Sequence, residues 1–144
     1  MSETGIGASV LRKEDQRFLT GRGNYVDDIE LLGMLHVAFV RSPHAHANIK
    51  SVETSTAEAL EGVVAVFTGA EMQEELGELI LGWILPEQKQ TTHPPMAFDR
   101  VRFVGESVAV VVADSPEAAV DGAELVDVDY ESLPVVVDAE KATA

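Results

Sequence analysis

The sequence predicts an α/β (α+β) fold, a single domain with a mixed β-sheet and two or three short helices. The clearest signal is the apolar run Val108 to Ala113, which is typical of a strand buried on both faces. A helix should follow, because Ser115 can cap free backbone N–H groups and Pro116 fits the first helical turn. Val126 to Tyr130 then alternates like a half-buried strand. Strands joined by crossover helices in this order favour a mixed sheet.

The first upstream elements are two predicted strands. Leu35 to Arg41 should form a strand that ends at Ser42-Pro43, because the residue before proline disfavours helix and proline cannot continue a sheet. Ala47 to Glu53 also alternates, with Ile49 and Val52 on one face. We therefore expect 47–53 to be the hairpin partner or the neighbour of 35–41.

A short helix and a third strand are predicted next. Thr54 or Ser55 can cap a helix over 57–60, and Gly62 can end it. Val63 to Phe67 is apolar and is expected to be a buried strand.

The remaining segments carry weaker signals. Thr68 can cap a second short helix over 70–76, whereas 77–96 is expected to be long and irregular. The residues 131–134 are predicted to turn into the apolar stretch 135–137. We expect residues 1–11 to form a loose leader, 12–140 the domain and 141–144 a tail.

Composition excludes several classes of protein. The chain has 144 residues, enough for one domain, and an apolar content of 46% favours a folded globule. With 25 acidic and 10 basic residues the net charge is −15, which disfavours nucleic acid and anionic membranes as partners. The absence of cysteine excludes disulfides and iron–sulfur ligation by this chain. The first residues lack the pattern of a signal peptide, so we expect a soluble, cytoplasmic protein.

Two histidines are the first candidate site. His44 and His46 would share a face if they lay on a strand, and two histidines could begin a metal site. No third ligand is visible nearby, and zinc needs three or four ligands. We therefore favour a role in turn geometry and in packing against a neighbouring domain.

Several other motifs are weak. Gly5-x-Gly7 and Gly21-x-Gly23 lack the strand, the third glycine and the helix of a dinucleotide site. Ser107 lacks the second glycine of a nucleophile elbow. Asp27-Asp28 could bind a cation, but a turn is favoured.

Two patterns bear on whether this chain contacts a partner. The basic side chains of Arg12, Arg17 and Arg22 could dock on an acidic surface or pair with nearby carboxylates, and the sequence leaves both open. The segment 79–85 is almost wholly apolar, with Glu78 as the only charge beside it. We expect this segment to cover, or to be covered by, something outside this chain.

Five stretches of sequence, in order, resemble the N-terminal α/β-hammerhead domain of the molybdenum hydroxylases, the xanthine dehydrogenase, aldehyde oxidase and carbon monoxide dehydrogenase family. In that family this domain belongs to the large, molybdopterin-binding subunit. The matching segments are RFLTGRGNYVDD (17–28), GMLHVAFVRSPHAHA (33–47), GVVAVFTG (62–69), VGESVA (104–109) and VDYESLP (128–134).

The resemblance implies a role without an independent activity. The family's molybdopterin, iron–sulfur and FAD sites and its catalytic glutamate lie beyond the matched segment, so this chain is expected to bind no cofactor and to carry no catalytic residue. Its implied partners are the molybdopterin-binding domain or chain and the iron–sulfur subunit, with self-association also possible. We expect the contacts to involve Arg22, Tyr25, Asp28, Arg41, His44, His46, Leu79, Trp83 and Leu85.

Two other readings remain open. A stand-alone acidic domain with an apolar patch could bind a small molecule or regulate another protein. A small enzyme using His44 or His46 as a general base is less favoured, because no nucleophile or paired acid completes such a site. The substrate of a parent enzyme is not determined by this segment.

Overall fold

The computed structural model describes residues 5–79, 82–89 and 93–143, which fall into two compact units, Met1–Met34 and Leu35–Ala144. Unit 1 contains helix α1 (Asp15–Leu19) and the 3-10 helix η1 (Val26–Asp28). No residue of either helix is buried. The described part of unit 1 therefore has little core of its own.

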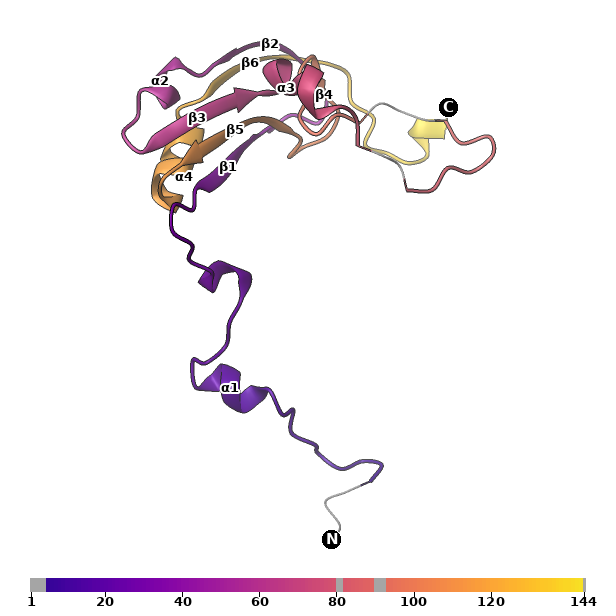
Figure 1. Ribbon diagram of the computed structural model, residues 1–144. Coiled ribbons are helices and arrows are strands. Elements are labelled where there is room, and N and C mark those ends of the chain that lie inside the picture. The colour runs from indigo at the N-terminus through magenta and orange to yellow at the C-terminus, as the bar shows by residue number, and fades with distance from the viewer. Residues whose placement is uncertain (1–4, 80–81, 90–92, 144) are drawn as a thin grey trace. The chain divides into compact units, whose positions relative to one another are not determined.

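Unit 2 contains two three-stranded sheets (Figure 1). Sheet A has the order β1-β5-β3 and sheet B the order β4-β2-β6, and neighbouring strands within each sheet pair antiparallel. The α+β class is confirmed, but the described strands form two antiparallel sheets instead of the single mixed sheet that we expected. The strands are β1 (His36–Arg41), β2 (Ala47–Glu53), β3 (Val63–Thr68), β4 (Arg100–Val101), β5 (Ser107–Ala113) and β6 (Asp127–Ser132).

Two helices of unit 2, α3 and α4, begin where the sequence indicates, whereas the helix expected over 57–60 begins two residues earlier, at Ser55, and the Thr54 side chain makes no cap bond. Ser115 caps α4 by accepting a hydrogen bond from the Ala118 N–H at 3.2 Å, and Pro116 occupies the first turn. Thr68 caps α3 by accepting from the Glu71 N–H at 3.3 Å. The helices are α2 (Ser55–Glu58), α3 (Gly69–Leu76), α4 (Pro116–Glu124) and the 3-10 helix η2 (Lys141–Thr143).

The expected hairpin between the first two strands is wrong. Strand β1 pairs with β5, and β2 pairs with β6 in the other sheet. The chain leaves sheet A at Ser42, whose N–H donates to the carbonyl oxygen of Glu106 at 2.9 Å. The turn after β1 is therefore anchored to a distant loop, and β2 starts in a different sheet.

Two apolar clusters form the core of unit 2. Ala57, Val66, Ala109, Val111 and Val126 form the first, against which α4 and sheet B pack. The second contains Ala47, Ala97, Val101 and Val108. A register shift opposite Val40 and Arg41 leaves Val108 without a paired residue, and its side chain is buried in the second cluster.

The end of β6 and the burial of β3 also differ from expectation. Strand β6 continues through Ser132, so Glu131 and Ser132 belong to the strand and not to a turn. Strand β3 is only half-buried, because Val64 and Phe67 are exposed while Val66 and Thr68 are buried. No helix in the described ranges is both long and apolar enough to cross a bilayer.

Candidate interaction surface

The histidine pair lies at the turn that follows β1. The buried Ser42 hydroxyl donates to the carbonyl oxygen of His44 at 3.1 Å and accepts from the His44 N–H at 3.0 Å. The ring of His44 lies 4.9 Å from that of Tyr130, and Nδ1 of His46 lies 2.8 Å from the carbonyl oxygen of Pro134. Both rings therefore contact β6 or the segment after it, as expected for turn geometry.

The acidity of Tyr130 is perturbed by its burial. Burial raises the pKa of Tyr130 above its usual value of 10.0, and the nearby Ser42 hydroxyl has a smaller, opposing influence. The Tyr130 hydroxyl is buried and makes no hydrogen bond of acceptable geometry to any described residue. The Ser42 hydroxyl exchanges its hydrogen bonds with the His44 backbone instead.

Arg41 closes the end of sheet A. Its Nη1 donates to the carbonyl oxygen of Gly105 at 2.9 Å and to Oγ of Ser107 at 3.3 Å. Its guanidinium also lies 5.4 Å from the centre of the Phe39 ring. Arg41 therefore holds the turn at Gly105, where φ is +89°, and Ser107 acts as its acceptor.

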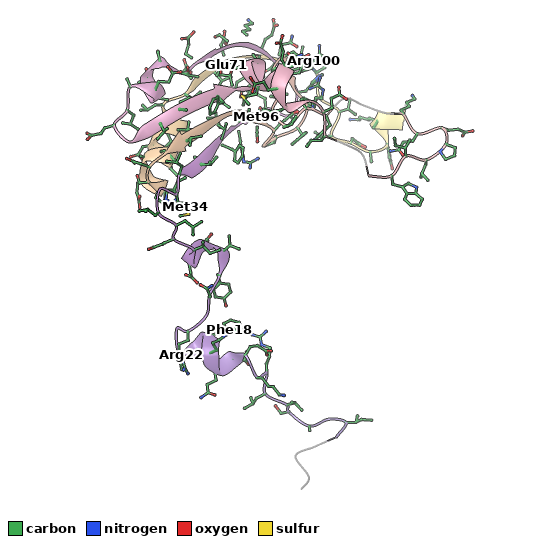
Figure 2. All side chains as sticks on the ribbon, in the orientation of Figure 1. Phe18, Arg22, Met34, Glu71, Met96 and Arg100 are labelled. Atoms are coloured by element: carbon green, nitrogen blue, oxygen red, sulfur yellow. The ribbon has the colours of Figure 1, made fainter. Side chains whose placement is uncertain are left out.

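Three expected contact residues lie in unit 1. Asp28 accepts a hydrogen bond from the Tyr25 N–H at 2.8 Å, which makes Asp28 a turn residue as favoured. The Tyr25 and Phe18 rings are 5.6 Å apart. Nε of Arg22 donates to the Thr20 hydroxyl at 3.2 Å (Figure 2 shows Phe18 and Arg22). A nearby cation, Arg12, pairs with Asp15 at 2.7 Å.

The apolar segment 79–85 is exposed wherever it is described. Leu79, Trp83 and Leu85 lie on the surface, and Trp83 is 78% exposed. The N–H of Leu79 donates to the carbonyl oxygen of His93 at 3.0 Å. The central part of the segment, Ile80 and Leu81, lies outside the described residues.

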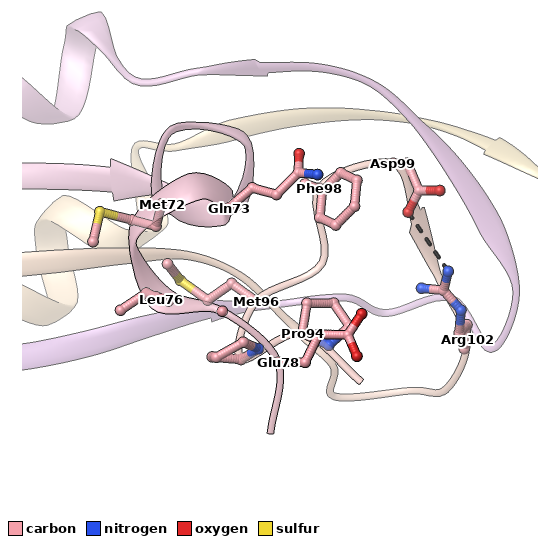
Figure 3. A pocket seen from close by; sticks show the side chains of 12 residues that line it. Met72, Gln73, Leu76, Glu78, Pro94, Met96, Phe98, Asp99 and Arg102 are labelled. Carbon is pink, nitrogen blue, oxygen red and sulfur yellow. Dashed lines mark ion pairs between the residues drawn. The ribbon is translucent and has the colours of Figure 1, made fainter. Parts of the chain in front are cut away.

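A cavity of about 230 Å³ lies beside α3 (Figure 3). Its wall includes the thioethers of Met72 and Met96, and an ion pair between Asp99 and Arg102, with 3.6 Å between oxygen and nitrogen, stands at one side. The lining thus combines apolar side chains with the charged groups of Glu78, Asp99 and Arg102. In the parts of the chain that the structure describes, no three or more His, Cys, Asp or Glu residues come together as a metal site.

The sequence reasoning missed one apolar surface, which we call the open face of sheet A. It consists of the side chains that point away from the first core cluster on β1, β5 and β3. The apolar run of β5 was a signal for it, because that run predicts burial on both faces. The open face consists of Val37, Phe39, Ala65, Phe67, Val110 and Val112.

Comparison with known proteins gives a consistent result. Residues 20–134 match the family described as "Aldehyde oxidase and xanthine dehydrogenase, a/b hammerhead domain". The chain is 49% identical over 138 residues to the carbon monoxide dehydrogenase large chain of Afipia carboxidovorans, with 96% of this chain and 16% of that one covered.

Solved structures agree with the sequence match. Quinoline 2-oxidoreductase from Pseudomonas putida 86 superposes with a TM-score of 0.83 at 51% identity, over 96% of this chain and 18% of that one. A Cu,Mo carbon monoxide dehydrogenase superposes with a TM-score of 0.75 at 44% identity, over 96% and 17% of the two chains. The chain thus spans 16–18% of the length of these relatives. It belongs to the aldehyde oxidase and xanthine dehydrogenase family, as the α/β-hammerhead domain of the large subunit.

Proposed function

We propose that this chain is a structural and assembly domain of a molybdenum hydroxylase large subunit. It packs beside the molybdopterin-binding part of the enzyme and helps to seat an iron–sulfur subunit. It is not catalytic alone. A cytoplasmic location is part of the proposal, and the lack of cysteine is compatible with a reducing compartment.

One observation carries this proposal: the largest apolar side chains are not in the core. Every buried apolar residue of the described chain is Ala, Val or Met. None of the described Leu, Ile, Phe or Trp residues is buried to the same degree, and many are exposed. Large exposed apolar patches mark interaction sites, so these side chains are best explained as contacts with other parts of an enzyme.

The proposed contacts keep the residues named above. Arg22, Tyr25 and Asp28 provide a polar turn in unit 1, whereas Leu79, Trp83 and Leu85 provide an apolar anchor in unit 2. Arg41, His44 and His46 are already bonded within the chain, so their proposed role is to hold a turn in a shape that a partner recognises. These residues would act together only in the assembled enzyme.

The residues present do not fit one cofactor of the family, the iron–sulfur cluster. An iron–sulfur cluster needs thiolate ligands, and this chain has no cysteine. Within the described residues the acidic and histidine side chains do not cluster as metal ligands. Molybdopterin, iron–sulfur clusters and FAD are proposed as cofactors of the parent complex.

A reconstitution experiment tests the assembly role. The chain would be mixed with the iron–sulfur subunit and with the rest of the large chain from the Afipia carboxidovorans relative, and complexes would be measured by light scattering after gel filtration. We expect a stoichiometric complex that is weakened by Trp83→Ser and Leu85→Ser. Val120→Ser, at an exposed position on α4, is the control and should assemble normally. A folded chain that joins neither component would refute the proposal.

The cavity beside α3 supports a second candidate, a small-molecule binding or regulatory module. The about 230 Å³ cavity is lined by apolar side chains such as Met72, Met96 and Phe98. A thermal-shift screen with aromatic heterocycles tests it, because a ligand stabilises the state that it binds. A shift that is abolished by Met96→Gln but retained in Val120→Ser would support this candidate.

A further inference from the structure

The cavity beside α3 has two chemically different sides. Met72 and Leu76 line one side, and the ion pair between Asp99 and Arg102 stands at the other (Figure 3). The buried side chain of Met96 also belongs to the apolar part of the wall. A ligand that contacts both sides needs an apolar body and a polar end.

Arg102, the cation of this cavity, already has partners within the chain. Its Nη2 lies 3.6 Å from Oδ1 of Asp99, and its Nη1 donates to the carbonyl oxygen of Arg100 at 2.9 Å. An anionic ligand would have to compete with both groups for the guanidinium. The cavity is therefore poorly suited to an anion.

Glu78 is a carboxylate in the lining without such a partner. Its side chain forms no hydrogen bond or ion pair with any other described residue. Glu78 and Asp99 together contribute a charge of −2 and Arg102 contributes +1, so the lining has a net charge of −1. The whole chain, with a net charge of −15, attracts cations as well. Both the local and the overall charge therefore favour a cationic ligand.

The size and the chemistry of the wall limit the rest of the ligand. An apolar cavity of about 150 Å³ holds benzene, so a cavity of about 230 Å³ has room for a ring with a short chain. Thioethers such as those of Met72 and Met96 make favourable contacts with aromatic rings. The ring of Phe98, also in the lining, can interact with a cation or with another aromatic ring.

We infer that this cavity binds a small aryl-alkylamine in its protonated form, with the aromatic ring beside the methionines and the ammonium group paired with Glu78. An alkylamine is protonated at about pH 7, as a lysine side chain is. The ligand class rests on the second candidate function proposed above, small-molecule binding, and is independent of the assembly role.

Binding can be observed at the methionines themselves. The chain has four methionines, of which Met72 and Met96 line the cavity and Met34 does not. The full chain would be labelled with carbon-13 at the methionine methyl groups and titrated with phenethylamine, a cation, and with the similar-sized phenylethyl alcohol and phenylacetate. We expect phenethylamine to shift the NMR signals of Met72 and Met96 but not that of Met34. It should bind at least about tenfold more tightly than the neutral alcohol or the anion.

Two substitutions that remove the same charge separate the cavity from general charge attraction. Glu78→Gln removes the carboxylate in the lining, whereas Glu74→Gln removes one on α3 that does not line the cavity. We expect Glu78→Gln to weaken phenethylamine binding by at least about tenfold and to leave the binding of phenylethyl alcohol unchanged. Glu74→Gln should bind both compounds as the wild type does. Both positions are exposed, so both variants should fold, which circular dichroism would check.

Equal weakening in the two variants would overturn the inference, because general charge attraction would then explain the binding. Equal affinity for phenethylamine and phenylethyl alcohol at Met72 and Met96 would also overturn it, but the small-molecule candidate would stand. If neither these compounds nor the heterocycles of the thermal-shift screen bind, the inference and that candidate are both wrong. The assembly role is judged by reconstitution alone, so its failure is distinguishable from all of these results.

Discussion

Gly122 of α4 and Val111 of β5 are in direct contact where the helix packs on sheet A. A Cβ atom on Gly122 would lie 2.9 Å from Cγ1 of Val111 and 2.9 Å from Cγ2 of Val63. Both valines lie on strands of the sheet and cannot move aside easily. Glycine inside a helix costs about 1 kcal/mol relative to alanine, so close packing explains a residue that helix propensity disfavours.

Gly122→Ala should therefore destabilise the domain. The new methyl group gains about 1 kcal/mol in helix propensity but adds about 1–3 kcal/mol of overpacking, so we expect a net loss of about 1 kcal/mol in the free energy of unfolding. Urea denaturation followed by circular dichroism measures it. Gly82→Ala is the control, because a Cβ at Gly82 meets no atom of the described residues within 4 Å. A Gly122→Ala variant as stable as the wild type would contradict the packing explanation.

Thr68→Val should lower stability through the cap of α3. Thr68 and Glu71 exchange hydrogen bonds: the Glu71 carboxylate accepts from the Thr68 N–H at 2.8 Å and from its hydroxyl at 2.9 Å. Valine keeps the volume and removes the hydroxyl, so the loss should be about 1 kcal/mol. Thr54→Val is the comparison: the Thr54 hydroxyl donates to the exposed Glu58 carboxylate at 2.6 Å but makes no cap bond to the backbone of α2, so the loss of stability should be smaller. Thermal unfolding should give a lower Tm for Thr68→Val than for Thr54→Val.

Tyr130→Phe should be close to neutral at about pH 7, because the hydroxyl that it removes has no hydrogen-bond partner among the described residues. At high pH the variant should become more stable relative to the wild type. The raised pKa of Tyr130 means that the folded state holds its proton more tightly than the unfolded state. This contribution is complete below about pH 10 and is lost as pH rises through the folded pKa.

Urea midpoints of the wild type and Tyr130→Phe, measured between about pH 7 and about pH 11, check this prediction. Tyr25→Phe removes an exposed tyrosine from unit 1 and should follow the wild type. Parallel curves for the wild type and Tyr130→Phe would show that the burial of Tyr130 has no effect on proton binding.

Glu106→Ala should loosen the loop before β5. The buried Glu106 carboxylate accepts a hydrogen bond from the Arg102 N–H, and Ser42 binds the Glu106 carbonyl oxygen. Removing the carboxylate leaves the Arg102 N–H without its acceptor, which costs about 1–3 kcal/mol. Glu106→Gln keeps an acceptor oxygen, so its free energy of unfolding should fall clearly less than that of Glu106→Ala. Chemical denaturation of both variants tests this order, and an equal loss would contradict it.

Features that depend on local sequence, such as helix starts, were predicted correctly. Ser115, Pro116 and Thr68 start helices where expected, because a cap depends on residues within one turn of it. Strand partners were not predictable in the same way. The alternation in 47–53 indicates a strand but contains no information about its partner, and the anchor of Ser42 to Glu106 is a contact between distant residues.

The candidate interaction surface shows the same difference between features set by local sequence and features set by contacts between distant residues. Exposure of Trp83 was predicted from an apolar segment without helical spacing, which needs only the local sequence. The open face was missed because it depends on register: Phe39 and Phe67 become neighbours only through their shared partner Val110. The functions of Arg41 and His46 as internal hydrogen-bonding groups likewise depend on contacts across more than 60 residues of chain.

The pairing of distant strands also sets the order of events during synthesis. Strand β1 must wait for β5, since His36 pairs with Ala113, and β2 must wait for β6, since Ala47 pairs with Ser132. Neither sheet can close until its late strand has left the ribosome. The apolar strands β1 and β3 therefore stay unpaired until β5 has been synthesised, and folding should be slow for a domain of this size. This topology should increase the demand for chaperones on the nascent chain.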